Sequence, residues 1–145
     1  MTMKSILLAG VLGAGLLTLN AADKVEAGPK GGRILAKTNP KAEFFVEKDK
    51  TISVNFYDAS LKPVPAGEQN VTVIADTKAG KQKVEFAKKG DALVSKTMLP
   101  DGDGYNLVVQ FKSSSEAKPQ NFRFKYDAST CAGCKLAEYA CTCHE

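Results

Sequence analysis

Alternation of apolar and polar side chains is the feature that most constrains the fold of this chain. Apolar residues occupy every second position in several short runs, which fall at 42–46, 52–56, 71–75, 84–86, 105–111 and 122–126. A period of two places successive side chains on opposite faces of a β-strand, so each run predicts a strand with one buried face. Turn-forming segments rich in Gly, Pro, Asp and Lys separate the runs.

The same pattern predicts an all-β fold, because no stretch before residue 129 has the apolar spacing of an amphipathic helix. Seven or eight short antiparallel strands are typical of an immunoglobulin-like β-sandwich, and we expect one such domain over residues 31–128. Tyr105 follows an Asp/Gly turn at residues 101–104. It is either a tyrosine corner, with its hydroxyl bonded back to the turn, or an ordinary core tyrosine after a turn.

Residues 1–22 have the features of a secretory signal peptide. Lys4 supplies a positive charge, residues 6–19 form a mainly apolar run, and cleavage is expected after Ala21 or Ala22. The apolar run is short for a membrane span, so no membrane anchor is expected after cleavage. The sequence therefore predicts a periplasmic or secreted monomer in an oxidising compartment, with residues 23–30 as a flexible leader.

Charge and histidine content argue against two classes of function. The chain has 20 Lys and Arg against 16 Asp and Glu, for a formal net charge of +4, and these charges are interspersed. No basic stripe interleaved with aromatic residues is present, so we expect no nucleic-acid partner. We also expect no enzyme, because the one histidine, His144, is poorly placed to be oriented by a buried acid.

The chemistry of the chain is concentrated in a tail at residues 129–145. It holds all four cysteines, Cys131, Cys134, Cys141 and Cys143, and His144. Thiolates bind Cu(I) and Zn(II) strongly, and four ligands from such a set close a tetrahedral site. The first hypothesis is therefore a soft-metal site made by the four cysteines, with His144 as an auxiliary ligand.

We expect the tail to be a short helix, with Ser129 or Thr130 as its N-cap. Positions seven apart lie almost on one helical face, which would bring Cys134 and Cys141 together.

Two disulfide bonds are the alternative, since the number of cysteines is even and the expected compartment is oxidising. A bond between Cys141 and Cys143 would close a strained small ring, so pairings between the two halves of the tail are expected, with either connectivity open. A redox-active pair is a third interpretation. It is less favoured because the Cys131–Cys134 motif does not open a helix in a βαβ unit.

One segment also resembles a known group of proteins. The chain has Gly28, Pro29, Gly31 and Gly32, then Glu43 and Phe44, and then Asp49. Over residues 28–65 it resembles small periplasmic β-domains associated with heavy-metal efflux of the RND type, including the N-terminal region of some membrane-fusion (adaptor) proteins. Lys30 stands where that pattern has a histidine. The resemblance implies a metal-handling setting, and it does not transfer a ligand.

Two functions therefore remain open on the sequence. The first is an exported protein that buffers or hands over Cu(I) or Zn(II) through the tail, with efflux components as partners. The second is a disulfide-stapled interaction module in which the tail has no metal role.

Overall fold

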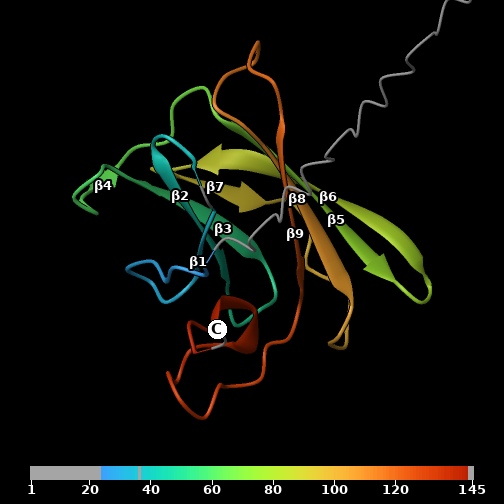
Figure 1. The fold of residues 1–145 in the computed structure, drawn as a ribbon. Coiled ribbons are helices and arrows are strands. Elements are labelled where there is room, and N and C mark those ends of the chain that lie inside the picture. The colour runs from blue at the N-terminus through green and yellow to red at the C-terminus, as the bar shows by residue number, and fades with distance from the viewer. Residues whose placement is uncertain (1–23, 36, 144–145) are drawn as a thin grey trace, which may run out of the picture.

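The computed structural model describes residues 24–35 and 37–143, and in them nearly all regular structure is antiparallel β (Figure 1). The expected signal peptide lies outside the described residues. The strands are β1 (Arg33–Leu35), β2 (Lys41–Val46), β3 (Ile52–Tyr57), β4 (Pro63–Val64), β5 (Asn70–Thr77), β6 (Gly80–Lys89), β7 (Ala92–Ser95), β8 (Asn106–Lys112) and β9 (Gln120–Lys125). The predicted all-β sandwich is confirmed, with nine strands in the described part of the chain in place of seven or eight.

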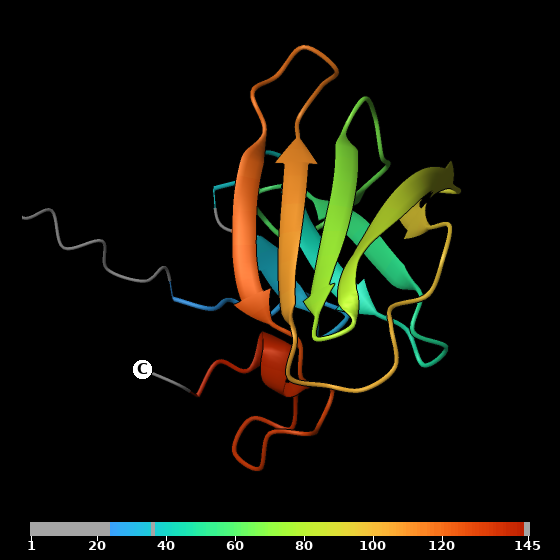
Figure 2. The same ribbon diagram turned by 90° about the vertical axis from the view of Figure 1, so that its right-hand side faces the viewer.

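The long strand β6 joins the two layers of the sandwich. The strands pair in the order β1-β2-β3-β7-β6-β5-β8-β9, with β4 added beside β3. The first part of β6 pairs with β5 up to the Thr72–Glu85 pair, and the last part pairs with β7 from the Phe86–Ser95 pair onward. In Figure 2 strands β9, β8, β5 and β6 lie side by side in front of the other layer. The two layers thus form a nearly closed barrel.

The core is built from the alternating positions that the sequence indicated. One face of each main strand is buried, with these side chains at 2% exposure or less: Ala42, Phe44, Ile52, Val54, Phe56, Val71, Val73, Ala75, Val84, Leu107, Val109 and Phe111. Strands β1, β4 and β7 were not expected. They have two to four residues each, which is too short for a period of two to be recognised.

Side chains span the gap between β1 and β9, the two strands that end the pairing order. The Phe44 and Phe124 rings meet edge to face with centroids 5.4 Å apart, and the Arg33 guanidinium lies 4.6 Å from the centroid of the Phe124 ring. Aromatic and cation–π contacts therefore close this seam where main-chain pairing does not.

Tyr105 forms a tyrosine corner. Its hydroxyl donates a hydrogen bond to the Pro100 carbonyl at 3.0 Å, and its ring packs on Tyr126 with a centroid distance of 5.2 Å. Burial raises the pKa of Tyr105. Of the two interpretations of this turn, the structure supports the corner.

A buried carboxylate organises the outer surface of β2. Glu43 points away from the core, yet it is 0% exposed because a glycine loop, residues 28–32, covers it. Its carboxylate accepts hydrogen bonds from the backbone N–H groups of Lys30 (3.0 Å) and Gly32 (2.8 Å) and from the Tyr57 hydroxyl (2.7 Å). A Cβ atom at Gly28 would collide with the Glu43 side chain. The loop therefore lies directly on the carboxylate. Its N–H groups supply hydrogen bonds that the buried carboxylate would otherwise make with water.

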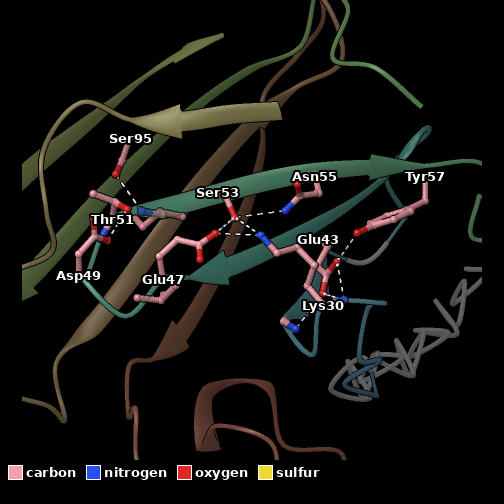
Figure 3. Close-up of polar contacts among 12 residues, drawn as sticks. Lys30, Glu43, Glu47, Asp49, Thr51, Ser53, Asn55, Tyr57 and Ser95 are labelled. Atoms are coloured by element: carbon pink, nitrogen blue, oxygen red, sulfur yellow. Dashed lines mark hydrogen bonds and ion pairs between the residues drawn. The ribbon is translucent and has the colours of Figure 1, made fainter. Parts of the chain in front are cut away.

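The outer faces of β2 and β3 carry a polar network beside this carboxylate (Figure 3). Lys30 Nζ lies 2.8 Å from Glu47 Oε1 and 3.3 Å from Ser53 Oγ, and it sits 4.7 Å from the centroid of the Phe45 ring. Ser53 Oγ donates to the same Glu47 oxygen at 2.9 Å. Lys30 is thus engaged in an ion pair and a cation–π contact.

Replacing Glu43 by Gln tests the role of the buried carboxylate. The amide turns one acceptor into a donor, so at least one of the N–H and O–H groups facing it loses its partner. We expect the free energy of unfolding to fall by about 2 kcal/mol, measured by chemical denaturation. Glu47→Gln is the matched control, because its ion pair is partly exposed and its loss should cost under about 1 kcal/mol. Equal effects of the two changes would contradict this role for Glu43.

Candidate metal centre

Two tight turns build the tail after β9. The Cys131 N–H donates to the Leu136 carbonyl at 2.7 Å, and the Lys135 N–H donates to the Cys131 carbonyl at 3.0 Å. Thr130 and Ala137 form an isolated antiparallel bridge on either side of this turn. A single 3₁₀ turn, η1 (Glu138–Ala140), follows and ends where the Cys141 N–H bonds to the Glu138 carbonyl at 3.1 Å. These turns fold the chain back on itself, so the two halves of the cysteine motif face each other.

The expected helix through the tail is wrong. Lys135 has a φ of 64°, in the left-handed region, which ends any right-handed helix at this point. Ser129 does not cap a helix either, since its hydroxyl donates to Asp127 Oδ1 at 2.6 Å. Only η1 is helical within the described part of the tail. Cys134 and Cys141 do meet, but they meet across two turns and not on one helical face.

The four cysteine sulfurs converge on one point. All four Sγ atoms lie within 4.8 Å of one another. Cys134 Sγ is 3.6 Å and Cys131 Sγ 3.0 Å from Cys141 Sγ. None of the four cysteines forms a disulfide bond in this structure. A tetrahedral ion with metal–sulfur bonds of about 2.3 Å needs sulfurs about 3.8 Å apart, so this arrangement is compatible with a metal site after small adjustments.

Backbone N–H groups and neighbouring thiols set different proton affinities within the cluster. The N–H groups of Leu136 and Thr142 lower the pKa of the Cys134 thiol to about 6. Hydrogen bonding with Cys131 raises the pKa of the Cys141 thiol to about 12. The pKa of Cys143 is also raised, chiefly by hydrogen bonding with the Cys134 side chain. Of these three thiols Cys134 is therefore the most readily deprotonated, and metal binding would displace protons from Cys141 and Cys143.

Tyr139 fastens the tail to the sandwich. It is 4% exposed, and its hydroxyl oxygen accepts a hydrogen bond from the Val46 N–H at 3.0 Å. Its ring centroid lies 6.1 Å from Phe44 and 5.9 Å from Tyr126. Burial raises the pKa of Tyr139 to about 12. Because Tyr139 stands between Cys134 and Cys141 in the chain, the packing that buries it also places two of the sulfurs.

The glycine loop gives the tail a second contact. A Cβ at Gly31 would lie 3.3 Å from Leu136 Cδ2, so the Leu136 side chain packs closely on the loop. Beside this contact is a groove of about 820 Å³ between the glycine loop, the β2–β3 turn and the tail. Lys30, Glu47, Lys135 and Tyr139 are among its lining residues. The tail is thus one wall of a surface groove.

The structure brings together four of the five expected ligands. Cys131, Cys134, Cys141 and Cys143 form the cluster, while His144 lies outside the described residues. Tyr139 as the anchor, and the N–H groups of Leu136 and Thr142 as donors to sulfur, were not expected from the sequence. Gly133 was not expected either, and a Cβ there would come within 2.8 Å of Cys143 Sγ. A glycine inside a Cys-x-x-Cys turn was the available signal for that close approach.

Comparison with known proteins gives no relative from which a function can be carried over. No protein-family model matches the chain, and no curated protein or solved structure is significantly similar to it. Among residues 24–35 and 37–143, no helix has the length and apolar character needed to cross a membrane. The function must therefore be argued from the site itself.

Truncating Tyr139 tests whether the tail is part of the folded body. Tyr139→Ala removes a buried ring between Phe44 and Tyr126, and we expect the free energy of unfolding to fall by about 3–5 kcal/mol. Tyr139→Phe keeps the ring and loses only the partner of the Val46 N–H, which should cost about 1 kcal/mol. Thermal and chemical denaturation measure both. A Tyr139→Ala protein as stable as the unaltered chain would show that the tail is not docked.

Proposed function

We propose that this chain is an exported protein that binds one soft metal ion, Zn(II) or Cu(I), through Cys131, Cys134, Cys141 and Cys143. The convergence of their four Sγ atoms within 4.8 Å carries the proposal. Four sulfurs that converge this closely, with no disulfide bond among them, are a ligand set typical of soft ions. His144 is proposed as an auxiliary ligand on chemical grounds alone.

The four-sulfur set favours Zn(II) as the first ion to test. Tetrahedral sulfur coordination is typical of zinc, whereas Cu(I) is selected mainly by the softness of the thiolate and not by this geometry. The N–H groups of Leu136 and Thr142 that point at Cys134 Sγ, and the Cys143 N–H that lies 3.4 Å from Cys141 Sγ, support negative charge on sulfur. The chain thus supplies both the ligands and the donors that hold them.

The biological setting is part of the same proposal. The signal-like residues 1–22 support export to the periplasm or beyond, and the sequence resemblance of residues 28–65 to domains of heavy-metal efflux systems favours a metal-handling setting. We infer that the protein buffers zinc or copper near such a system, or hands the ion to one of its components. A monomer with no catalytic role is sufficient for this function.

A disulfide-stapled interaction module is the competing function. In that case oxidation in an oxidising compartment would join the cysteines in pairs, and the sheet surface would bind a partner protein. The two functions differ in the number of free thiols in the protein isolated without reductant.

Metal titration of the mature protein tests the proposal. We expect four free thiols and one Zn(II) or Cu(I) bound per chain, measured by thiol labelling with mass spectrometry and by metal analysis after desalting. Cys134→Ser should lower the affinity at least about 10-fold, because it removes a ligand that accepts two N–H hydrogen bonds.

Thr142→Ala is the matched control, since it lies between two ligands and offers only its backbone N–H to the cluster. It should bind metal as the unaltered chain does. Two disulfide bonds in the isolated protein, together with no binding of either ion after reduction, would reject the metal function in favour of the interaction module.

A further inference from the structure

The four sulfurs differ in how firmly the chain holds them. Cys131 and Cys141 are 5% and 3% exposed. The Cys131 backbone is hydrogen bonded through both its N–H and its carbonyl, and the Cys141 N–H bonds to Glu138. Cys134 is half-buried, and its sulfur accepts two backbone N–H groups. Cys143 alone among the four is exposed.

Cys143 is linked to the rest of the cluster through both its thiol and its backbone. Its sulfur is hydrogen bonded with the three neighbouring thiols, and its N–H donates to Cys141 Sγ at 3.4 Å. Because Cys143 alone is exposed among the four cysteines, its side chain is the one open to solvent. A metal bond to Cys143 is therefore the bond that solvent and an incoming ligand reach first.

We propose that the site is a three-plus-one centre in which Cys143 is the exchangeable ligand, and that the ion leaves to a thiolate-bearing acceptor that takes the place of Cys143. This inference rests on the proposed metal function and deepens it. Cys131, Cys134 and Cys141 retain the ion while the acceptor approaches at the exposed side of the cluster. The partner class is a protein or small molecule with a free thiolate.

Gly133 is a positioning residue for this exchange. An added Cβ at this position would lie 2.8 Å from Cys143 Sγ, well inside contact distance, and 3.9 Å from Cys131 Sγ, which is an ordinary contact. Its φ is not in the left-handed region, so alanine is compatible with the backbone. Gly133→Ala should therefore displace Cys143 from the cluster and leave the other three sulfurs in place.

The exchange step involves no oxidation or reduction. The acceptor thiolate donates an electron pair to the ion and forms a new sulfur–metal bond. The bond between the ion and Cys143 Sγ breaks, the electron pair stays on Cys143, and this sulfur takes a proton from water. Further thiolates of the acceptor then replace the three held ligands. This order of events makes the rate of transfer depend on the acceptor concentration.

Transfer kinetics from the Zn(II)-loaded full chain test the inference. The probe is a small dithiol acceptor, with the released ion followed by a chromogenic zinc dye in a stopped-flow instrument. We expect the rate for the unaltered chain to rise in proportion to dithiol concentration. Cys143→Ser and Gly133→Ala should still carry one ion per chain and release it about 10-fold faster or more. Cys141→Ser, which lacks a buried ligand, should not retain the ion through desalting.

Gly67→Ala is the matched glycine control, since a Cβ there meets Gln69 at an ordinary 3.5 Å and lies outside the tail. Its transfer rate should equal that of the unaltered chain. Transfer that does not depend on dithiol concentration, or equal loss of the ion in Cys143→Ser and Cys141→Ser, would overturn the inference while leaving metal binding intact. Failure of the unaltered chain to take up Zn(II) or Cu(I) would instead overturn the proposed function.

Discussion

The buried Glu43 carboxylate is the group on which the placement of the cysteine cluster depends. A carboxyl group at 0% exposure needs hydrogen-bonding partners, and Glu43 finds them in the backbone N–H groups of the glycine loop and in the Tyr57 hydroxyl. These bonds fix a loop that would otherwise have little apolar surface to hold it. Leu136 packs on this loop, and the Leu136 N–H is directed at Cys134 Sγ. A carboxylate on one strand thus helps to place a sulfur about ninety positions later in the sequence.

Strand β2 supports the tail from both of its faces. The outer face acts through Glu43 and the glycine loop, and the inner face acts through Phe44, which packs on the Tyr139 ring. The Val46 N–H completes this support by donating to the Tyr139 hydroxyl. The glycine loop, Glu43 and Phe44 therefore build a platform at one end of the sandwich, on which the tail rests.

The predictable part of this structure is the part that depends on local pattern. The alternation of apolar and polar residues predicted the main strands and their buried face. The grouping of the cysteines in the tail predicted that their sulfurs would converge. The burial of Glu43 was not predictable, because its position in the alternation faces outward and only a loop more than ten residues away covers it.

The prediction of a helix in the tail was wrong for a related reason. A seven-residue spacing would bring Cys134 and Cys141 together on one face of a helix. A turn with Lys135 in the left-handed region brings the same two residues together, and the hydrogen bonds across that turn select the turn over the helix.

Charge balance in the cluster bears on which ion the four sulfurs can hold together. Four thiolates around a divalent ion carry about two excess negative charges, and around a monovalent ion about three. The chain offers N–H dipoles at Cys134 and Cys141 and the ammonium group of Lys135, whose Nζ donates to the Ala132 carbonyl at 2.7 Å inside the same turn. These N–H groups and the Lys135 ammonium group offset the two excess negative charges around a divalent ion more fully than the three around a monovalent ion. Zn(II) should therefore engage all four sulfurs, whereas Cu(I) should leave the exposed Cys143 protonated and be held by the anchored ligands, because a protonated thiol costs less than an uncompensated thiolate.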